Sequence, residues 1–219
     1  MEEEFKNHLE QLNNKRDVHG VYAEKLHKLC DGDFFPCHTL YLAVLDRSLN
    51  NLDALDVLLK NGDYGTAMAV LRLQIDNMCR FYGVLRTNDP HDTANIIAHG
   101  TPLKKIKDSD GKNLTDRYLV DLLSENSKWL LDVYQLCCGY IHFSEEHLKN
   151  TIGKSVPNNQ GSRDMYIGTG DDHVPLEHKV NLMLAFGLIT DIVFSLYDRW
   201  AEISAFYDPL VLKAMYEIA

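Results

Sequence analysis

The chain has 219 residues, 45% of them hydrophobic, which is enough to build the core of one large domain. Its 32 acidic and 22 basic residues give a formal net charge of -10, which disfavours tight non-specific binding to nucleic acid or to an anionic membrane. Five cysteines, two of them adjacent, do not suit a disulfide framework and indicate a reducing compartment.

The first 33 residues are expected to form an N-terminal helical appendage. Apolar positions are scattered among charged ones over residues 3–29, which indicates one or two surface helices. The opening sequence MEEEFKNHLEQ is acidic and unlike a signal peptide. No apolar run approaches the roughly 20 residues that span a bilayer. We therefore expect a cytoplasmic protein with no membrane partner.

Two long helices are predicted next. The first runs from Pro36 to about Lys60, where leucines recur at steps of three and four residues. Gly62 ends it, and Asp63 can cap the second helix, which covers residues 64–87 and closes before Pro90. Both helices therefore present one apolar face to a common core.

Shorter helices follow, each with a candidate N-cap. Asp92 is assigned as the cap of a helix that reaches residue 98, and Thr115 caps a helix over 118–123. Ser127 is assigned to a helix covering residues 127–144, and Ser144 to the turn that comes after it. This part of the chain therefore reads as helices joined by loops.

Residues 151–174 change in character. The segment 157–161 is turn-like, and Met165-Tyr166-Ile167 is a candidate strand, so a small hairpin or ordered loop is expected. A long helix with one apolar face then covers residues 176–203, and a final short helix begins near Pro209.

These elements predict an all-α, up-and-down helical bundle, because long helices with short links and one apolar stripe pack side by side. A single domain is expected over residues 1–219. Its parts are the appendage (1–33), the core motif helices (34–149), the β-hairpin-like excursion (151–174) and the C-terminal helices (175–219).

Two polar stripes interrupt the apolar helices. Arg72, Asp76 and Arg80 stand four residues apart, and so do Tyr134, Cys138 and His142. Residues at that spacing lie on one helix face, and polar groups within apolar sequence must be paired. The stripes therefore suggest a composite polar site. The alternatives are an exposed intrahelical ion pair for the arginines and a structural histidine in the bundle core.

The stripes lie in segments that resemble a known family. The sequence GDYGTA (62–67), followed by Leu71-Arg72 and Asp76, resembles a helix in a widespread prokaryotic family of unknown function. Residues 134–144, which end in His142-x-Ser144, resemble that family's second signature. The family is similar to the HEPN superfamily of helical bundles, found in toxins and in antiphage and abortive-infection systems. The resemblance covers residues 35–145 and the last long helix.

The resemblance implies a homodimer, with RNA or a protein as a further partner. Active HEPN ribonucleases carry an Arg a few residues before the His. The corresponding positions here, Gln135, Leu136 and Cys137, are not basic. We therefore expect a nucleic-acid- or partner-binding module of a defence or stress system with a degenerate nuclease motif.

The main alternative is an active, metal-independent ribonuclease, so whether the chain is an enzyme stays open. His142 would act as general acid or base, Arg72 would stabilise negative charge, Asp76 would orient Arg72, and Tyr134 would donate a hydrogen bond. Expected substrate contacts are Arg80 and the basic loop residues Lys104, Lys105 and Lys107.

A lesser alternative is an HD-type metal phosphohydrolase, on the dipeptide His91-Asp92. The dipeptide directly follows a proline break, which favours a capping role for Asp92. Cys30 and Cys37 are too widely spaced for a zinc site without a second cysteine pair. We expect no metal and no cofactor.

Overall fold

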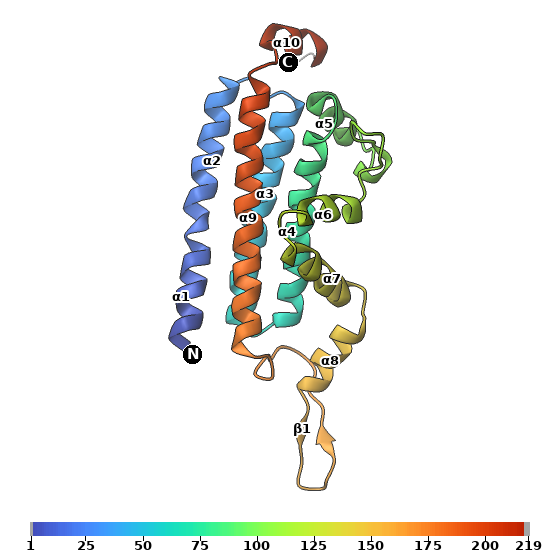
Figure 1. The fold of residues 1–219 in the computed structure, drawn as a ribbon. Helices are drawn as coiled ribbons and strands as arrows, with labels where there is room; N and C mark the ends of the chain where they lie inside the picture. The colour runs from blue at the N-terminus through green and yellow to red at the C-terminus, as the bar shows by residue number, and fades with distance from the viewer. Residues whose placement is uncertain (1, 217–219) are drawn as a thin grey trace.

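The computed structural model describes residues 2–216; Met1 and residues 217–219, the ends of the expected domain, lie outside that range. Most of the described chain is helical, and it includes one small antiparallel sheet (Figure 1). The elements in chain order are α1 (Glu2–Asn13), α2 (Lys15–Cys30), α3 (Pro36–Lys60), α4 (Tyr64–Leu85), α5 (Pro90–Ala98), η1 (Leu103–Lys105), α6 (Asp116–Ser124), α7 (Trp129–Ile141), α8 (Glu145–Gly153), β1 (Val156–Pro157), β2 (Arg163–Asp164), α9 (Leu176–Ser204) and α10 (Pro209–Tyr216).

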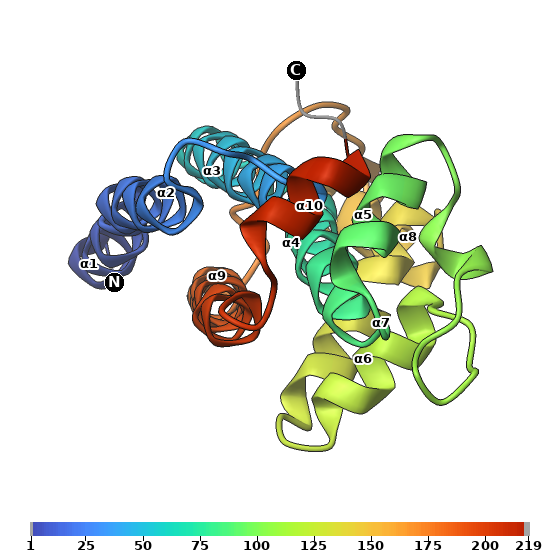
Figure 2. The same cartoon turned by 90° about the horizontal axis from the view of Figure 1, so that it is seen from above.

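The long helices form a bundle with α4 near its centre. Helix α4 packs against α3, α9, α7 and α6, whereas α1 and α2 lie along α9 and α3 (Figure 2). Elements α2, α3 and α4 alternate in direction, as an up-and-down bundle requires (Figure 1). Helix α9 instead runs parallel to α4, because α5 to α8 descend along the side of the bundle before α9 begins. The up-and-down prediction therefore holds for the first half of the fold.

A buried polar layer crosses the apolar core. The Gln74 side chain donates to Ser48 Oγ over 2.7 Å and to Thr190 Oγ1 over 3.2 Å, and it accepts from Asn51 Nδ2 over 3.1 Å. His19 Nε2 lies 2.9 Å from Ser48 Oγ. These residues join α2, α3, α4 and α9 through groups that water cannot reach, so the layer fixes the register of four helices.

Helix α1 approaches α9 closely at Gly187. A Cβ atom placed there would lie 3.1 Å from Cε of Lys15 and 3.8 Å from Cδ1 of Leu12. Leu9 and Leu12 of α1 are consequently buried against α9. The small residue in α9 thus gives the N-terminal helix its place on the bundle.

Helix α9 contradicts the expectation that no apolar run is long enough for a membrane. Residues Leu176–Ser204 are long and apolar enough to cross one, and 67% of the qualifying window is buried inside the structure. A helix at the core of a soluble protein has this character, because it is apolar on every face that its neighbours cover.

The predicted caps are confirmed at Asp63, Thr115 and Ser144, each of which accepts a backbone N–H of the first helical turn. The cap of α5 is Asp89 instead of Asp92, because Asp89 accepts from the backbone N–H groups of the two residues after Pro90. The cap position of α7 is Lys128, which makes no side-chain capping bond, so Ser127 was wrongly assigned.

The expected hairpin is present, but its second strand was placed wrongly. Strand β1 pairs with β2 at residues 163–164, not at 165–167. Arg163 Nε and Nη2 donate to Oγ and the carbonyl oxygen of Ser155, at 2.7 and 2.8 Å. These bonds help to fix the pairing at residues 163–164, directly before Met165, and the apolar residues 165–167 are left exposed.

Candidate polar site between α4, α6 and α7

Arg72 lies at the centre of the candidate site, with its side chain only 11% exposed. Its Nη2 contacts Asp116 Oδ2 of α6 at 3.1 Å, and its Nη1 lies 4.0 Å from Asp76 Oδ1. The guanidinium also lies over the ring of Tyr134 of α7, 4.6 Å from the centroid. The charge of Arg72 is therefore paired twice and covered by an aromatic face.

The neighbours of Arg72 hold it in the charged state. Burial alone lowers the pKa of Arg72, but hydrogen bonding to Cys138, the nearby Tyr134 and the pair with Asp116 outweigh it, so the pKa is raised. Burial raises the pKa of Tyr134, and Cys138 adds to that effect. The two sequence stripes thus meet through Arg72, Tyr134 and Cys138, as the spacing of the residues suggested.

Asp76 is shared among three arginines. Its carboxylate lies 3.3 Å from Nη1 of Arg47 in α3 and 3.5 Å from Nη2 of Arg80, besides the contact with Arg72. The side chains of Arg47 and Arg80 are about two-fifths exposed, so these two pairs border the solvent. Asp76 therefore bridges α3 and α4 as well as placing Arg72.

His142 does not join this group. It is the residue that ends α7, and its side chain is exposed. The imidazole makes no hydrogen bond, ion pair or ring contact with any residue in the range 2–216, since its only recorded bond is from its backbone N–H to Cys138. The imidazole of His142 and the guanidinium of Arg72, which were expected to share one site, therefore do not contact each other in the described chain.

The basic loop is exposed at the side of the bundle. Lys104, Lys105 and Lys107 are all exposed, and none forms an ion pair within residues 2–216. The neighbouring carboxylates are engaged elsewhere: Asp108 accepts from Tyr118 over 2.6 Å, and Asp110 pairs with Arg86 at 2.9 Å. The three lysines stay available to a polyanion, but nothing places them beside Arg72.

His91 and Asp92 point in different directions. His91 is fully buried against Trp200 and Tyr207, whereas the side chain of Asp92 is exposed to solvent. One metal ion cannot be reached by a buried imidazole and an exposed carboxylate of this kind. The geometry therefore does not favour HD chemistry.

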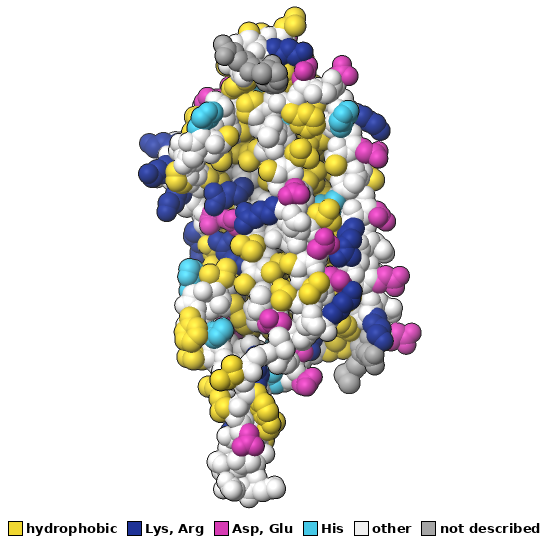
Figure 3. All heavy atoms as spheres, turned by 180° about the vertical axis from the view of Figure 1, so that it is seen from behind, with side chains coloured by type: hydrophobic (Ala, Val, Ile, Leu, Met, Phe, Trp, Pro, Cys, Tyr) yellow, Lys and Arg dark blue, Asp and Glu magenta, His cyan; other side chains and the backbone are white. Residues whose placement is uncertain are grey.

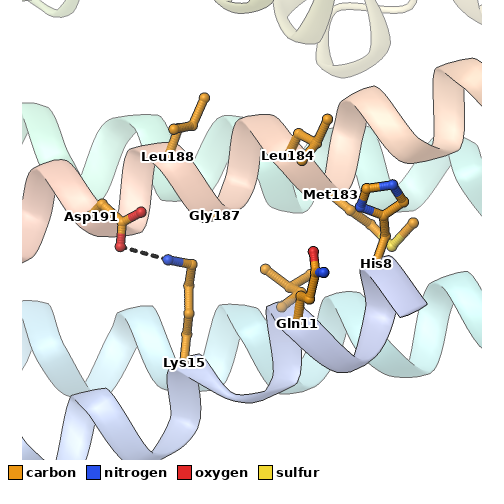
Figure 4. Close-up of a pocket in the computed structure, with 9 residues that line it drawn as sticks. His8, Gln11, Lys15, Met183, Leu184, Gly187, Leu188 and Asp191 are labelled. Atoms are coloured by element: carbon orange, nitrogen blue, oxygen red, sulfur yellow. Dashed lines mark hydrogen bonds and ion pairs between the residues drawn. The ribbon is translucent and has the colours of Figure 1, made fainter. Parts of the chain in front are cut away.

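A shallow groove between α1 and α9 is the hollow shown in Figure 4. It measures about 330 Å³, and Leu184 and Leu188 are exposed along it. Lys15 and Asp191 close one end with an ion pair of 2.5 Å. None of the residues in the two polar stripes lines this groove.

The comparisons with known proteins return no match: no family model, curated protein or solved structure is significantly similar to this chain. The functional interpretation accordingly rests on the motifs and on the geometry of the site.

Two features of the site were missed from the sequence. Asp116 is the nearer of the two carboxylates that pair with Arg72, yet it stands 44 positions away and looks like an ordinary first-turn acidic residue. Nothing in the sequence pairs His91 with His38, although their ring centroids lie only 5.2 Å apart. Neither pairing leaves a periodic pattern in the sequence, because each joins two helices that are separated by other elements along the chain.

Proposed function

We propose that this protein is a non-catalytic, HEPN-like helical module that acts in the cytoplasm, in a defence or stress system, by binding a second copy of itself. The observation that carries this proposal is the state of Arg72. Its charge is neutralised by Asp116 and Asp76, and its open face is covered by Tyr134.

A ribonuclease of the expected kind needs a cation that can reach the scissile phosphate, with the acid or base beside it. Arg72 would have to leave two carboxylates and a ring before it could bind a phosphate. His142 is exposed at the end of α7, and no cation or carboxylate of residues 2–216 contacts it. The arrangement favours a structural role for the Arg72 group, which ties α4 to α6 and α7.

An exposed apolar surface supports a binding role. Large hydrophobic side chains gather around the base of the projecting hairpin (Figure 3). They come from the end of α7, from α8 and from the hairpin, and the exposed ones are Ile141, Phe143, Leu148, Ile152, Val156, Met165, Tyr166 and Ile167. We call this set the hairpin-base surface. Exposed apolar patches on soluble proteins commonly mark interaction sites.

The net negative charge of the chain opposes the association of two copies. Two chains of formal charge -10 repel one another, so they can associate only where the local surface is largely uncharged. The hairpin-base surface meets that condition, because its carboxylates Glu145 and Glu146 are both paired with Lys149. A homodimer through this surface buries large apolar side chains that are otherwise exposed.

Sedimentation velocity over a range of concentrations tests the association. We expect a reversible dimer for the natural sequence and a monomer for the double variant Phe143→Ser and Ile167→Ser. Phe206→Ser is the matched control, because Phe206 is equally apolar and is 90% exposed at the other end of the bundle. A natural chain that stays monomeric at every concentration would reject the second copy as partner.

Incubation with structured RNA tests the absence of catalysis. We expect no cleavage above that of the His142→Ala variant, which should fold normally because His142 is exposed. Cleavage by the natural chain that disappears in both His142→Ala and Arg72→Met would overturn the proposal in favour of a ribonuclease. Binding without cleavage that weakens when Lys104, Lys105 and Lys107 are changed together would make RNA the partner.

A further inference from the structure

The apolar run Met165-Tyr166-Ile167 directly follows strand β2 but has no strand partner in the described chain. Its backbone N–H and C=O groups form no hydrogen bond with any residue in the range 2–216. The three residues are 58%, 55% and 103% exposed, and the hairpin that carries them projects from the end of the bundle (Figure 1). An exposed, unpaired run of this composition is the kind of edge to which another strand can be added.

The register of the hairpin shows which backbone groups face outward. Pro157 is opposite Arg163, and the neighbouring pair is closed by a 2.9 Å bond from the Asn158 N–H to the Ser162 carbonyl oxygen. Hydrogen-bonded and non-hydrogen-bonded pairs alternate along an antiparallel ladder. The N–H and C=O of Asp164 therefore face β1, whereas those of Arg163 face away from it.

The two edges of the hairpin are not equally open. Pro157 faces outward on β1 and has no N–H, and a proline on an edge strand blocks the addition of a further strand. On the β2 edge, an extended chain presents the backbone N–H and C=O of Arg163, Met165 and Ile167 outward, because alternate residues face the same edge. Residues 165–170 include no proline and no charged side chain. Only the β2 edge of this hairpin is therefore open to a further strand.

The charged side chains beside the open edge are already engaged within the hairpin. The Arg163 guanidinium donates to Ser155, and Asp164 Oδ1 accepts from Asn158 Nδ2 over 2.9 Å. Neither charge needs a counter-charge from outside. A partner for this edge has to supply backbone donors and acceptors together with apolar side chains.

A second copy of the same run meets these requirements. Two identical strands that pair antiparallel are related by a two-fold axis, so each copy receives the contacts that it gives, as an isologous dimer requires. The association stops at two chains, because the other edge of each hairpin carries Pro157. The pairing rests on the homodimer proposed above, since residues 165–167 belong to the hairpin-base surface.

Charge and chain direction limit where the two-fold axis can pass. An outward-facing residue has to lie opposite another one, so the axis passes through a residue position. An axis at Asp164 would place two carboxylates opposite each other, which is unfavourable. An axis at Tyr166 would bring residues 168–169 into the ladder, where the chain bends. An axis at Met165 keeps the whole ladder within residues 163–167.

We propose that two copies of the chain associate by antiparallel pairing of residues 163–167, centred on Met165. Arg163 of each copy lies opposite Ile167 of the other, and the two Met165 residues exchange backbone hydrogen bonds. Asp164 lies opposite Tyr166, so no like charges face one another. One continuous sheet with the strand order β1-β2-β2-β1 then joins the two bundles.

Amide exchange followed by ¹⁵N NMR at low and high protein concentration tests the pairing. We expect the amides of Arg163, Met165 and Ile167 to exchange at least tenfold more slowly in the dimer. The Tyr166 amide should stay fast, because its N–H faces the side of β1, where it has no partner in the described chain. Asp164 is the internal control, since its N–H faces β1 and should be protected at every concentration.

The exchange data separate the strand pairing from the dimer itself. Fast exchange at Met165 and Ile167 in a chain that dimerises would overturn the strand pairing and leave the homodimer standing. A chain that stays monomeric at every concentration would reject both.

Two substitutions at one position separate the backbone from the side chain. Met165→Ser and Met165→Pro both remove the apolar side chain, but only the proline removes the N–H. Both variants should fold, because Met165 is exposed and Asp164 before it is already in a strand, which a following proline tolerates. In sedimentation velocity we expect Met165→Pro to weaken the dimer at least tenfold more than Met165→Ser. Equal weakening would show that side-chain contacts alone hold the copies together and would overturn the proposal.

Discussion

Arg72 shows how one side chain can hold several helices together. It is nearly buried, and a buried charge is stable only when its partners are well placed. Asp116, Asp76 and Tyr134 supply an ion pair, a second carboxylate and an aromatic face from three helices. A guanidinium can serve all three at once because it is planar and carries five donors.

The substitution Arg72→Lys should therefore not be conservative. A lysine ammonium keeps the charge but cannot contact both carboxylates and stack on Tyr134, so we expect a loss of about 1–2 kcal/mol in the free energy of unfolding. Arg117→Lys is the control, since the pair of Arg117 with Asp121 is exposed and its change should lose less than about 0.5 kcal/mol. Urea unfolding of both variants gives the comparison, and equal losses would contradict the structural role of Arg72.

Gln74 is a second single residue that links several helices, because it lies at the centre of the buried polar layer. Replacing it by Leu leaves the buried Asn51 amide without its partner, whereas Ser48 keeps His19 and Thr190 keeps the Phe186 carbonyl, so the change should cost about 1–3 kcal/mol. The same change at the exposed Gln135 of α7 should cost less than about 0.5 kcal/mol. Thermal unfolding of the two variants measures the difference, and a neutral Gln74→Leu would mean that the layer contributes nothing net to stability.

At the scale of the elements, the attachment of α1 depends on the missing side chain at Gly187. A leucine there would collide with Leu12 and Lys15, so Gly187→Leu should release α1 from α9 while the rest of the bundle stays folded. Hydrogen exchange would then show faster exchange throughout α1. Gly20→Leu is the matched control, because no heavy atom lies within 4 Å of a Cβ at Gly20. Unchanged protection of α1 in Gly187→Leu would contradict this account.

Helix positions could be read from the sequence because apolar periodicity and caps are local signals. The predicted helices over 36–60 and 176–203 match α3 and α9 to within one residue at each end. The errors fell where two local signals competed. Asp89 and Asp92 both precede apolar sequence, and the proline between them makes Asp89 the cap. Residues 165–167 have strand composition, but the bonds from Arg163 to Ser155, eight residues earlier, set the pairing instead.

The candidate site was predicted in part for the same reason. The sequence shows each stripe as one face of a helix, because its residues follow the 3.6-residue period. In the structure Arg72 does contact Tyr134 and Cys138. The sequence cannot show how far a face extends toward a helix end. His142 follows the last turn of α7, where the chain turns away, so it shares the stripe by spacing but not the contacts. The direction of α9 relative to α4 likewise depends on the path of α5 to α8, which has no periodic signature.

For the molecule as a whole, the buried histidines predict how stability depends on pH. The pKa of His38 and of His91 is lowered to about 4 by burial, and His38 adds to the effect on His91. Asp33 and Asp89 act in the opposite direction, but the net pKa of both rings stays below the value of about 6.5 expected in the unfolded chain. The unfolded state therefore binds more protons than the folded state at pH values between about 4 and 6.5.

Stability should consequently be fully present above pH about 6.5 and should fall as the pH drops toward 4, by up to about 1.4 kcal/mol per pH unit for each histidine. Urea unfolding at pH 7, 6 and 5 measures this slope. His91→Phe should reduce it by close to one proton, whereas His147→Phe, at a histidine outside the buried cluster, should leave it unchanged. A slope that His91→Phe does not alter would show that this ring binds its proton equally well in the folded and the unfolded protein, and would contradict the lowered pKa.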